Sequence, residues 1–157
     1  MRKSQMTRIP QNISSSNPAW MDLDRIALVE VSSEQTGYPI ESALVLEGQR
    51  EWRAAHPGMQ TIRLIFDEPQ KLRRILLVFE DTENSRTQEF VVRWAPGIES
   101  SLREIVRQQW NFSPPDSVRE TEDYMVELSE VKVLELVIVP DKSGGEVHAS
   151  LASLRLA

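Results

Sequence analysis

The chain has 157 residues, of which 40% are hydrophobic and 27% charged, a composition that can build the core of one domain and argues against global disorder. Its formal net charge is −6, and a negative field makes nucleic acid and anionic membrane surfaces unlikely partners. There are no cysteines, which excludes disulfides, thiolate zinc sites and a cysteine nucleophile.

The N-terminal segment is polar, rich in serine and without periodicity, so we expect residues 1–19 to form a flexible arm. It begins with positive charges but lacks the apolar run of a signal peptide. No stretch of the sequence approaches the length of a membrane span. We therefore expect a cytoplasmic protein without a membrane partner, whose residues 20–157 form a single domain.

The ordered part is expected to open with a strand over residues 26–31, or with a short helix running into that strand. Serine, glycine and proline mark residues 32–39 as a loop. The following segment, residues 41–52, has room for one helical turn before the loop at Gly48.

The rest of the chain alternates between apolar and polar residues, and this period of two places an apolar face on each predicted strand. Turn signals stand between the runs, among them the sequences DEPQ, APGIES, SPPDS and DKSGGE. Such a series of short strands predicts an antiparallel sandwich or barrel. The predicted strands are residues 60–66, 72–80, 87–94, 102–112, 122–128, 132–140 and 151–157.

Residues that could carry catalysis are few. His56 and His148 lie far apart in the sequence and are interpreted as solvated or turn histidines. Glu80, Asp81 and Glu83 gather after a predicted strand, and paired carboxylates can hydrolyse glycosides. A solvated hairpin turn is the more ordinary interpretation of this acidic group.

The aromatic residues divide into core and loop candidates. Trp94 and Trp110 are in phase with apolar neighbours, which predicts that both belong to the core. Trp52 leads a strand, so core or rim is a better interpretation than a ligand platform. Tyr38 sits in a Gly-Pro loop, and loops on a rigid sandwich often carry function.

The stretch from Val29 to Phe66 resembles the opening of discoidin or coagulation factor 5/8 type C domains, within the galactose-binding-domain-like superfamily. The resemblance implies an all-β fold, an antiparallel β-sandwich with a jelly roll of about eight strands. It also implies a binding module whose commonest ligand is a sugar. The likeness extends from about Trp20 to Ala157, and its clearest matches are Ala43, Leu44, Trp52, Gln60, Ile62 and Leu64.

Calcium-binding members of that family hold the ion with aspartates in a loop. The matching positions here are Val45 and Glu47, Leu46 stands in place of the usual glycine, and a glutamate of the last strand is matched by Ser153. Because calcium prefers several hard oxygen ligands, we expect no structural calcium, no other metal and no cofactor.

A second, local likeness is to the N-terminal domain of the single-strand-break-repair scaffold protein, which shares the jelly roll. It rests on the segment Trp52 to Ala55 followed by Gly58, Thr61 and Ile62. The resemblance implies an intracellular interaction role, while the acidic charge disfavours binding to DNA.

Our leading hypothesis is a non-catalytic module that binds carbohydrate through loops at one end of the sandwich. A sugar site needs an aromatic face and planar polar groups. Gln35, Tyr38, Arg53 and His56 supply these groups if their two loops converge.

Two alternatives remain open. The first is an intracellular protein–protein interaction or scaffold module with a protein partner, which predicts an exposed apolar patch on one sheet, through Val91, Leu76 or Val78, or a stable dimer. The second is an enzyme, which would need a deep pocket with two close carboxylates. No nucleophile–base pair is evident in the sequence, so we expect no catalytic activity.

Overall fold

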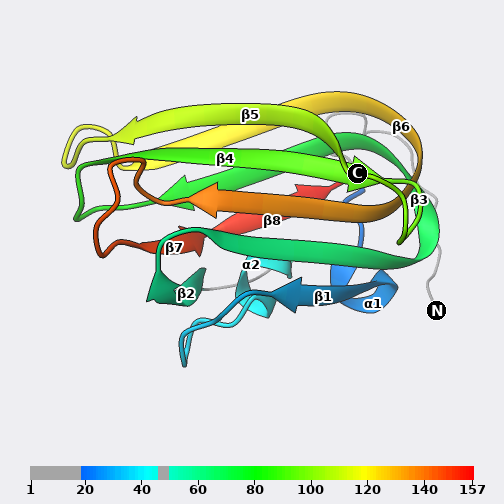
Figure 1. Cartoon of the computed structure of the whole chain (residues 1–157), viewed down its shortest axis with the longest axis horizontal. Coiled ribbons are helices and arrows are strands. Elements are labelled where there is room, and N and C mark those ends of the chain that lie inside the picture. The colour runs from blue at the N-terminus through cyan, green and yellow to red at the C-terminus, as the bar shows by residue number, and fades with distance from the viewer. Residues whose placement is uncertain (1–18, 46–49) are drawn as a thin grey trace.

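The structure is a computed structural model that describes residues 19–45 and 50–157, and it is almost entirely β. Eight strands and two single helical turns occur in these residues, as Figure 1 shows, which confirms the predicted all-β class. The elements are α1 (Leu23–Ile26), β1 (Ala27–Val31), α2 (Glu41–Leu44), β2 (Trp52–Pro57), β3 (Gln60–Glu80), β4 (Arg86–Ala95), β5 (Arg103–Phe112), β6 (Arg119–Val139), β7 (His148–Leu151) and β8 (Ser153–Leu156). Most of the predicted arm, residues 1–18, lies outside the described part.

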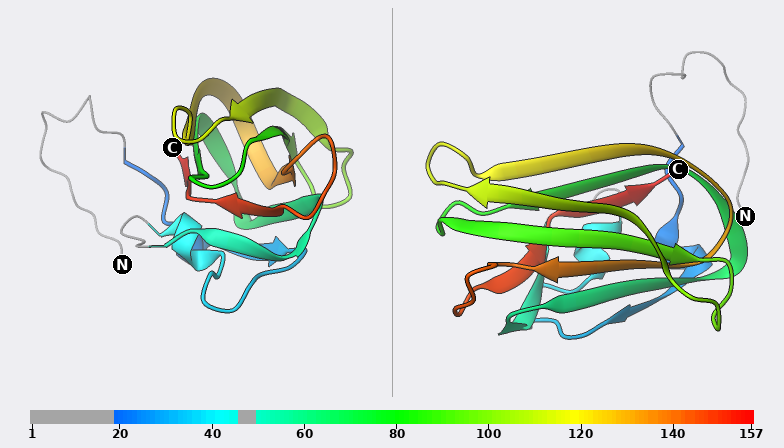
Figure 2. Two further views of the ribbon diagram at one scale, coloured as in Figure 1. Left: turned by 90° about the vertical axis from the view of Figure 1, so that its left-hand side faces the viewer. Right: turned by 45° about the horizontal axis from the view of Figure 1, so that its top comes forward.

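Two long antiparallel strands, β3 and β6, form the spine of the sandwich. Strands lie in the order β1-β3-β6-β4-β5, β8 pairs with β3, and β2 pairs with β7 in a small second sheet. The first half of β3 pairs with the second half of β6, and the second half of β3 with the first half of β6. Both strands curve together at one end, which folds the long sheet back into two layers (Figures 1 and 2).

The sequence DEPQ, Asp67 to Gln70, was expected to be a turn between two strands, and this prediction is wrong. It lies inside β3, where the pairing with β6 shifts register between Ile65 and Gln70. Pro69 has no N–H to donate to a ladder, so the pairing is interrupted while the chain stays extended. Because β6 pairs with β3 on both sides of this irregularity, the predicted strands 122–128 and 132–140 likewise belong to one bent strand, β6, rather than to two.

The terminal run, residues 151–157, differs from its prediction in the opposite way. It is divided between β7 and β8, with Ala152 between them. β7 pairs with β2, whereas β8 pairs with β3. The Ala152 N–H donates to the Val78 carbonyl at 2.9 Å, so the backbone changes partner at this residue. This change places β7 beside the candidate site.

The core lies between the layers and is built by the apolar faces that alternation predicted. Trp52 is completely buried, and its indole Nε1 donates to the Ser33 carbonyl at 3.1 Å. Trp94 and Trp110 pack against the core but are only partly buried, so they stand at its margin. The predicted inward residues that are fully buried include Ile62, Leu64, Phe66, Ile75, Leu77, Phe79, Leu134, Leu136, Ile138, Leu154 and Leu156.

The outer face of the long sheet carries a row of alternating charge across five strands. In register across β1, β3, β6, β4 and β5 stand Glu30, Arg63, Glu135, Arg93 and Glu104. Arg63 Nη2 lies 2.6 Å from the Glu135 carboxylate, and Arg93 Nη1 lies 3.5 Å from it. Opposite charges directly across a ladder favour one register over its neighbours.

We predict that Trp52→Ala lowers the free energy of unfolding by about 3–5 kcal/mol, because it removes a fully buried aromatic and leaves a cavity. Trp110→Ala should lower the free energy of unfolding by less, since this side chain is partly exposed. Urea unfolding of both variants measures the difference. Equal losses would contradict the placement of Trp110 at the margin.

Candidate ligand-binding site

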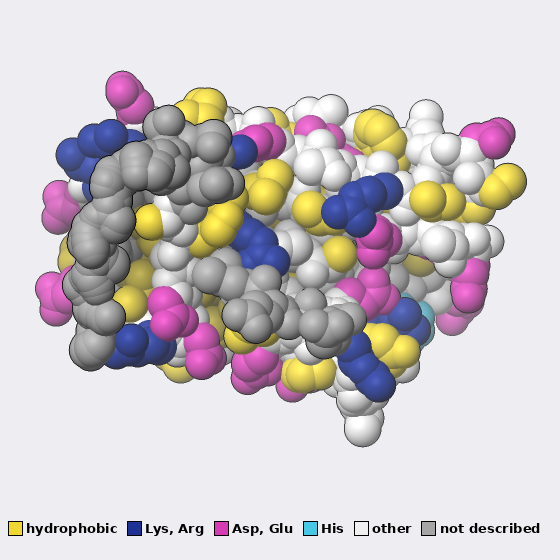
Figure 3. Space-filling model, turned by 180° about the vertical axis from the view of Figure 1, so that it is seen from behind, with side chains coloured by type: hydrophobic (Ala, Val, Ile, Leu, Met, Phe, Trp, Pro, Cys, Tyr) yellow, Lys and Arg dark blue, Asp and Glu magenta, His cyan; other side chains and the backbone are white. Residues whose placement is uncertain are grey.

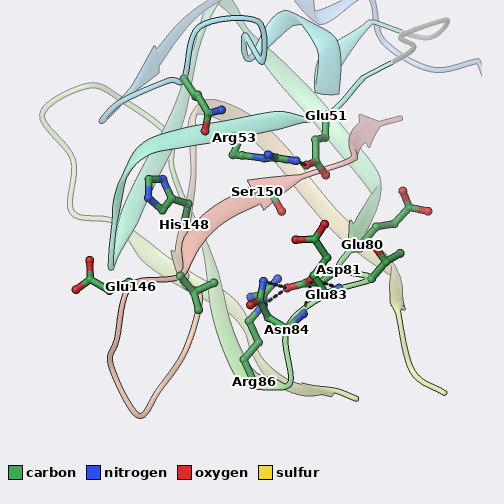
Figure 4. Close-up of a pocket in the computed structure, with 13 residues that line it drawn as sticks. Glu51, Arg53, Glu80, Asp81, Glu83, Asn84, Arg86, Glu146, His148 and Ser150 are labelled. Carbon is green, nitrogen blue, oxygen red and sulfur yellow. Dashed lines mark hydrogen bonds and ion pairs between the residues drawn. The ribbon is translucent and has the colours of Figure 1, made fainter. Parts of the chain in front are cut away.

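A pocket of about 550 Å³ opens where the β3–β4 loop approaches β2 and β7 (Figure 4). Charged and polar side chains line most of it. They come from the loop after β1, from β2, from the β3–β4 loop and from the segment leading into β7. The lining residues are Gln35, Glu51, Arg53, Glu80, Asp81, Thr82, Glu83, Asn84, Arg86, Glu146, Val147, His148 and Ser150.

Arg53 is held in place on β2 by two neighbours. Its Nε and Nη2 donate to the same Glu51 carboxylate oxygen, at 3.2 and 2.6 Å. The centre of its guanidinium lies 4.2 Å from the centroid of the Tyr38 ring. The hydrogen bond that Arg53 donates to Glu51 is the main reason that the pKa of Arg53 is raised above its usual value. The side chain is 38% exposed, so a positioned cation faces the pocket.

The loop that carries Tyr38 is bonded to β2 through its backbone. The Gln35 N–H donates to the Arg53 carbonyl at 2.8 Å, and the Arg53 N–H donates to the Tyr38 carbonyl at 3.2 Å. Gly37, between them, has a φ of 90°, a conformation that favours glycine. The loop that carries Gln35 and Tyr38 therefore lies directly beside Arg53 on β2.

β7 continues the wall that β2 forms, because the two strands are paired and Ser150 lies directly across from Arg53. Ala149 and Leu151 point into the core, whereas His148 and Ser150 line the pocket. His148 Nδ1 lies 2.8 Å from the Ala54 carbonyl, which requires a proton on Nδ1 and leaves Nε2 as the acceptor of the neutral ring. Ser150 is only 7% exposed, and its hydroxyl has no hydrogen bond to any described residue.

The β3–β4 loop owes its shape to Asp81. The Asp81 carboxylate accepts the backbone N–H groups of Glu83 and Asn84 at 2.8 and 3.0 Å, and Arg86 Nε at 2.6 Å. Burial opposes ionisation here, but the backbone N–H of Glu83, the Arg86 guanidinium and the N–H of Asn84 together keep the pKa of Asp81 below its usual value. The loop is thus closed over an ionised carboxylate, with Glu83 and Asn84 held at the pocket.

Arg86 connects this loop to the rest of the sandwich. Its side chain is 1% exposed. Besides Asp81, its Nη1 donates to Gln88 Oε1 at 3.1 Å and to the Pro140 carbonyl at 2.7 Å. Its guanidinium also lies 4.5 Å from the Phe112 ring centroid. One buried cation therefore ties together the β3–β4 loop, β4, the end of β6 and β5.

The polar interior continues from Gln88 to Glu120. Gln88 Nε2 donates to Glu120 Oε1 at 3.2 Å, while Glu120 Oε2 is buried without a hydrogen-bond partner. Burial first, and then the nearby Glu122, raise the pKa of Glu120 to about 9. Glu120 is therefore protonated at neutral pH.

The structure brings only some of the four predicted site residues to the pocket. Gln35 and Arg53 line the pocket. Tyr38 lies against Arg53, so one face of its ring is covered by a guanidinium rather than free for a sugar. His56 is exposed and does not line this pocket. Whether any of the four contacts a ligand stays a prediction.

Sequence reasoning missed the β7 wall and undervalued the acidic loop. His148 was interpreted as a solvated histidine, and Glu80, Asp81 and Glu83 as a solvated hairpin turn. Asp81 and Glu83 do lie in the β3–β4 loop and Glu80 ends β3, but all three also line the pocket. The alternation of His148 and Ser150 with Ala149 and Leu151 was a usable signal for a strand with one polar face.

Within residues 19–45 and 50–157, no three His, Cys, Asp or Glu side chains are grouped so that they could hold a metal ion. Val45, the first position matched to the family's calcium loop, is exposed, while Leu46 and Glu47 lie outside the described residues. In the same described ranges, neither helix has the length or apolar character needed to cross a membrane.

Several solved structures with a similar arrangement are carbohydrate-binding modules. One is the family 32 module of AlyQ in complex with 4,5-unsaturated mannuronic acid, at 16% identity and a TM-score of 0.63, covering 89% of this chain and 98% of that one. Another is a pectin-binding module, at 16% identity and a TM-score of 0.62, covering 84% and 90%. A third is the family 32 module of NanJ from C. perfringens in complex with galactose, at 12% identity and a TM-score of 0.61, covering 87% and 96%.

These similarities establish the fold: the chain has the jelly-roll sandwich fold of these modules, the fold that its sequence resemblance implied. No protein-family model matches the sequence, and no curated protein matches it significantly. The local likeness to the repair scaffold stays a resemblance of sequence alone.

We predict that Arg86→Ala lowers the free energy of unfolding by about 3–5 kcal/mol, because it leaves Asp81 partly buried without its cation. Arg119→Ala is the matched control, since Arg119 forms an exposed ion pair with Glu80 and such pairs contribute about 0–1 kcal/mol. Chemical denaturation measures both. Similar losses in the two variants would contradict the role assigned to Arg86.

Glu120 should make stability depend on pH. The folded chain keeps this proton up to a pKa of about 9, whereas the unfolded chain releases it near 4.5. The folded state therefore binds more protons between these values, and its stability falls as pH rises through them. Glu120→Gln should flatten this decline and stabilise the protein at alkaline pH. Urea midpoints measured across this pH range test it, with exposed Glu127→Gln as control; parallel profiles for both variants would overturn it.

Proposed function

We propose that this chain is a non-catalytic carbohydrate-binding module whose ligand site is the pocket between the paired strands β2 and β7, which carry Arg53 and Ser150, and the β3–β4 loop. The observation that carries the proposal is the set of polar groups left without protein partners around one pocket. Arg53 Nη1 and the Ser150 hydroxyl have no hydrogen bond to any described residue, and the Nε2 of His148 is an available acceptor.

A sugar presents many hydroxyls that both donate and accept, so its site needs fixed donors and acceptors in close array. Arg53 is fixed by Glu51 and Tyr38, and His148 by the Ala54 carbonyl. Ser150 stands on a strand directly paired with Arg53. Groups that are already held lose little conformational freedom on binding. This supports recognition of a polar ligand of sugar size.

The same contacts argue against catalysis. Hydrolysis of a glycosidic bond needs one carboxylic acid and one free carboxylate across the bond. In the pocket, Glu51 and Asp81 are engaged by Arg53 and Arg86 at 2.6 Å each. Glu83 and Glu146 form no ion pair with the described residues, but both are exposed to water on separate loops, which is not the enclosed pair that hydrolysis needs. The low pKa of Asp81 makes it a poor acid. Glu120, which is protonated, does not line the pocket. The solved modules with this fold point in the same direction.

The protein-interaction alternative gains nothing from the structure. Val78 and Val91, two residues suggested for an exposed patch, are 6% and 4% exposed. On the face seen in Figure 3, acidic and basic side chains alternate with small hydrophobic groups. We keep a cytoplasmic location as part of the proposal, on the grounds of the sequence alone.

Calorimetric titration with mono- and oligosaccharides tests the proposal. We expect at least one to bind, and Arg53→Ala to weaken that binding by about tenfold or more, because a hydrogen bond from a charged donor contributes about 1.5–3 kcal/mol. Arg73→Ala, an exposed arginine near the opposite end of the sandwich, should leave binding unchanged. Absence of binding across neutral, acidic and basic sugars would overturn the proposed function.

A further inference from the structure

We infer that the pocket prefers sugars that carry a protonated amine over neutral sugars and rejects uronic acids. This inference rests on the proposed function, because it concerns the same site. The inference is drawn from the carboxylates and guanidinium groups that line the pocket and from which of them already form ion pairs.

Five carboxylates line the pocket, against two guanidinium groups. Three of the carboxylates belong to ion pairs: Glu51 with Arg53, Asp81 with Arg86, and Glu80 with Arg119. The remaining two, Glu83 and Glu146, form no ion pair with any residue that the structure describes. They come from different loops, between β3 and β4 and between β6 and β7. The pocket therefore has uncompensated negative charge on two of its sides.

A second, independent feature shows that this region is built to receive a polar group. Ser150 is more than nine-tenths buried, lines the pocket and has an unpartnered hydroxyl. In Figure 4 its oxygen points from β7 toward the space in front of the β3–β4 loop. The Ser150 hydroxyl is not sealed in the core but opens on the pocket. A ligand hydroxyl or amine can therefore form a hydrogen bond with it there.

The ammonium group is the cation that suits this arrangement best. It offers three donors and no acceptor, and hydroxyl and carboxylate acceptors surround the pocket. A metal ion would need several carboxylates to converge, and no such group exists in the described ranges. A uronate would bring another carboxylate, while Arg53 is already shared with Glu51 and lies close enough to Glu83 for that charge to raise its pKa. The net charge of −6 adds a long-range attraction for cationic ligands.

The test compares three soluble oligomers of equal length: glucosamine, N-acetylglucosamine and mannuronate. Titrations at mildly acidic pH, where the amine is protonated, should give the tightest binding for the glucosamine oligomer and none for the mannuronate oligomer. Glu83→Gln and Glu146→Gln should each weaken glucosamine binding by about two- to fivefold, the effect expected of one exposed ion pair. Glu130→Gln, an exposed carboxylate near the opposite end, is the matched control.

The outcomes separate this inference from the proposed function. If the neutral or the mannuronate oligomer binds as well as the glucosamine oligomer, the module binds sugar but the charge preference is wrong. If Glu130→Gln weakens binding as much as Glu83→Gln, the attraction is a general effect of net charge, and the inference is also overturned. If no oligomer binds and no other sugar does, the proposed function itself fails.

Discussion

The buried guanidinium of Arg86 is the interaction on which the candidate site depends. Removing a cation from water is costly, and only close, well-directed partners offset that cost. Arg86 finds them in Asp81, in Gln88 and in the carbonyl of Pro140, each from a different part of the chain. Because all must be in place at once, the loop before β4 and the end of β6 are fixed relative to each other. The pocket stands on the positions that result.

The sandwich behind the site is organised by β3 and β6, which run through both layers. Because each of these strands runs through both layers, a shift of its pairing by one residue would turn its apolar side chains away from the core in both layers at once. The charged row across β1, β3, β6, β4 and β5 opposes such a slip. Glu135 is the centre of that row, 5% exposed and contacted by arginines on both sides. Register on the outer face thus helps determine where the strands end, and the pocket is built at their ends.

The fold was largely predictable because each strand has an apolar face that alternates clearly, as in Ile62, Leu64 and Phe66. Strand continuity was not, because Pro69 signals a turn locally while the pairing of β3 with β6 continues on both sides of it. The residues around Pro69 carry no information that β6, far away in the sequence, bends at the same place and keeps its pairing with β3. Trp110 was placed in the core for a similar reason: its phase is correct, but it lies on the edge strand β5, where burial is incomplete.

The site was predictable only in part. Arg53 and Tyr38 could be proposed because an aromatic loop and a planar cation lie near each other along the chain. His148 and Ser150 join them through the pairing of β2 with β7, a contact between residues almost a hundred positions apart. Nothing in a single sequence specifies that pairing. The acidic loop was recognised as a turn, but its second role depends on which elements surround it.

The residues that hold the site are different from those that face a ligand. Asp81 and Arg86 shape the β3–β4 loop and are largely buried. Glu83 on that loop and Glu146 on the loop between β6 and β7 are exposed and form no ion pair with the described part of the chain. The exposed positions can therefore change charge with little effect on stability, because surface substitutions usually cost less than about 0.5 kcal/mol. Modules of this fold have been solved with ligands as different as mannuronic acid and galactose. Because the buried Asp81–Arg86 pair holds the loop while exposed residues beside it can change charge, one scaffold can present either an anionic or a cationic pocket.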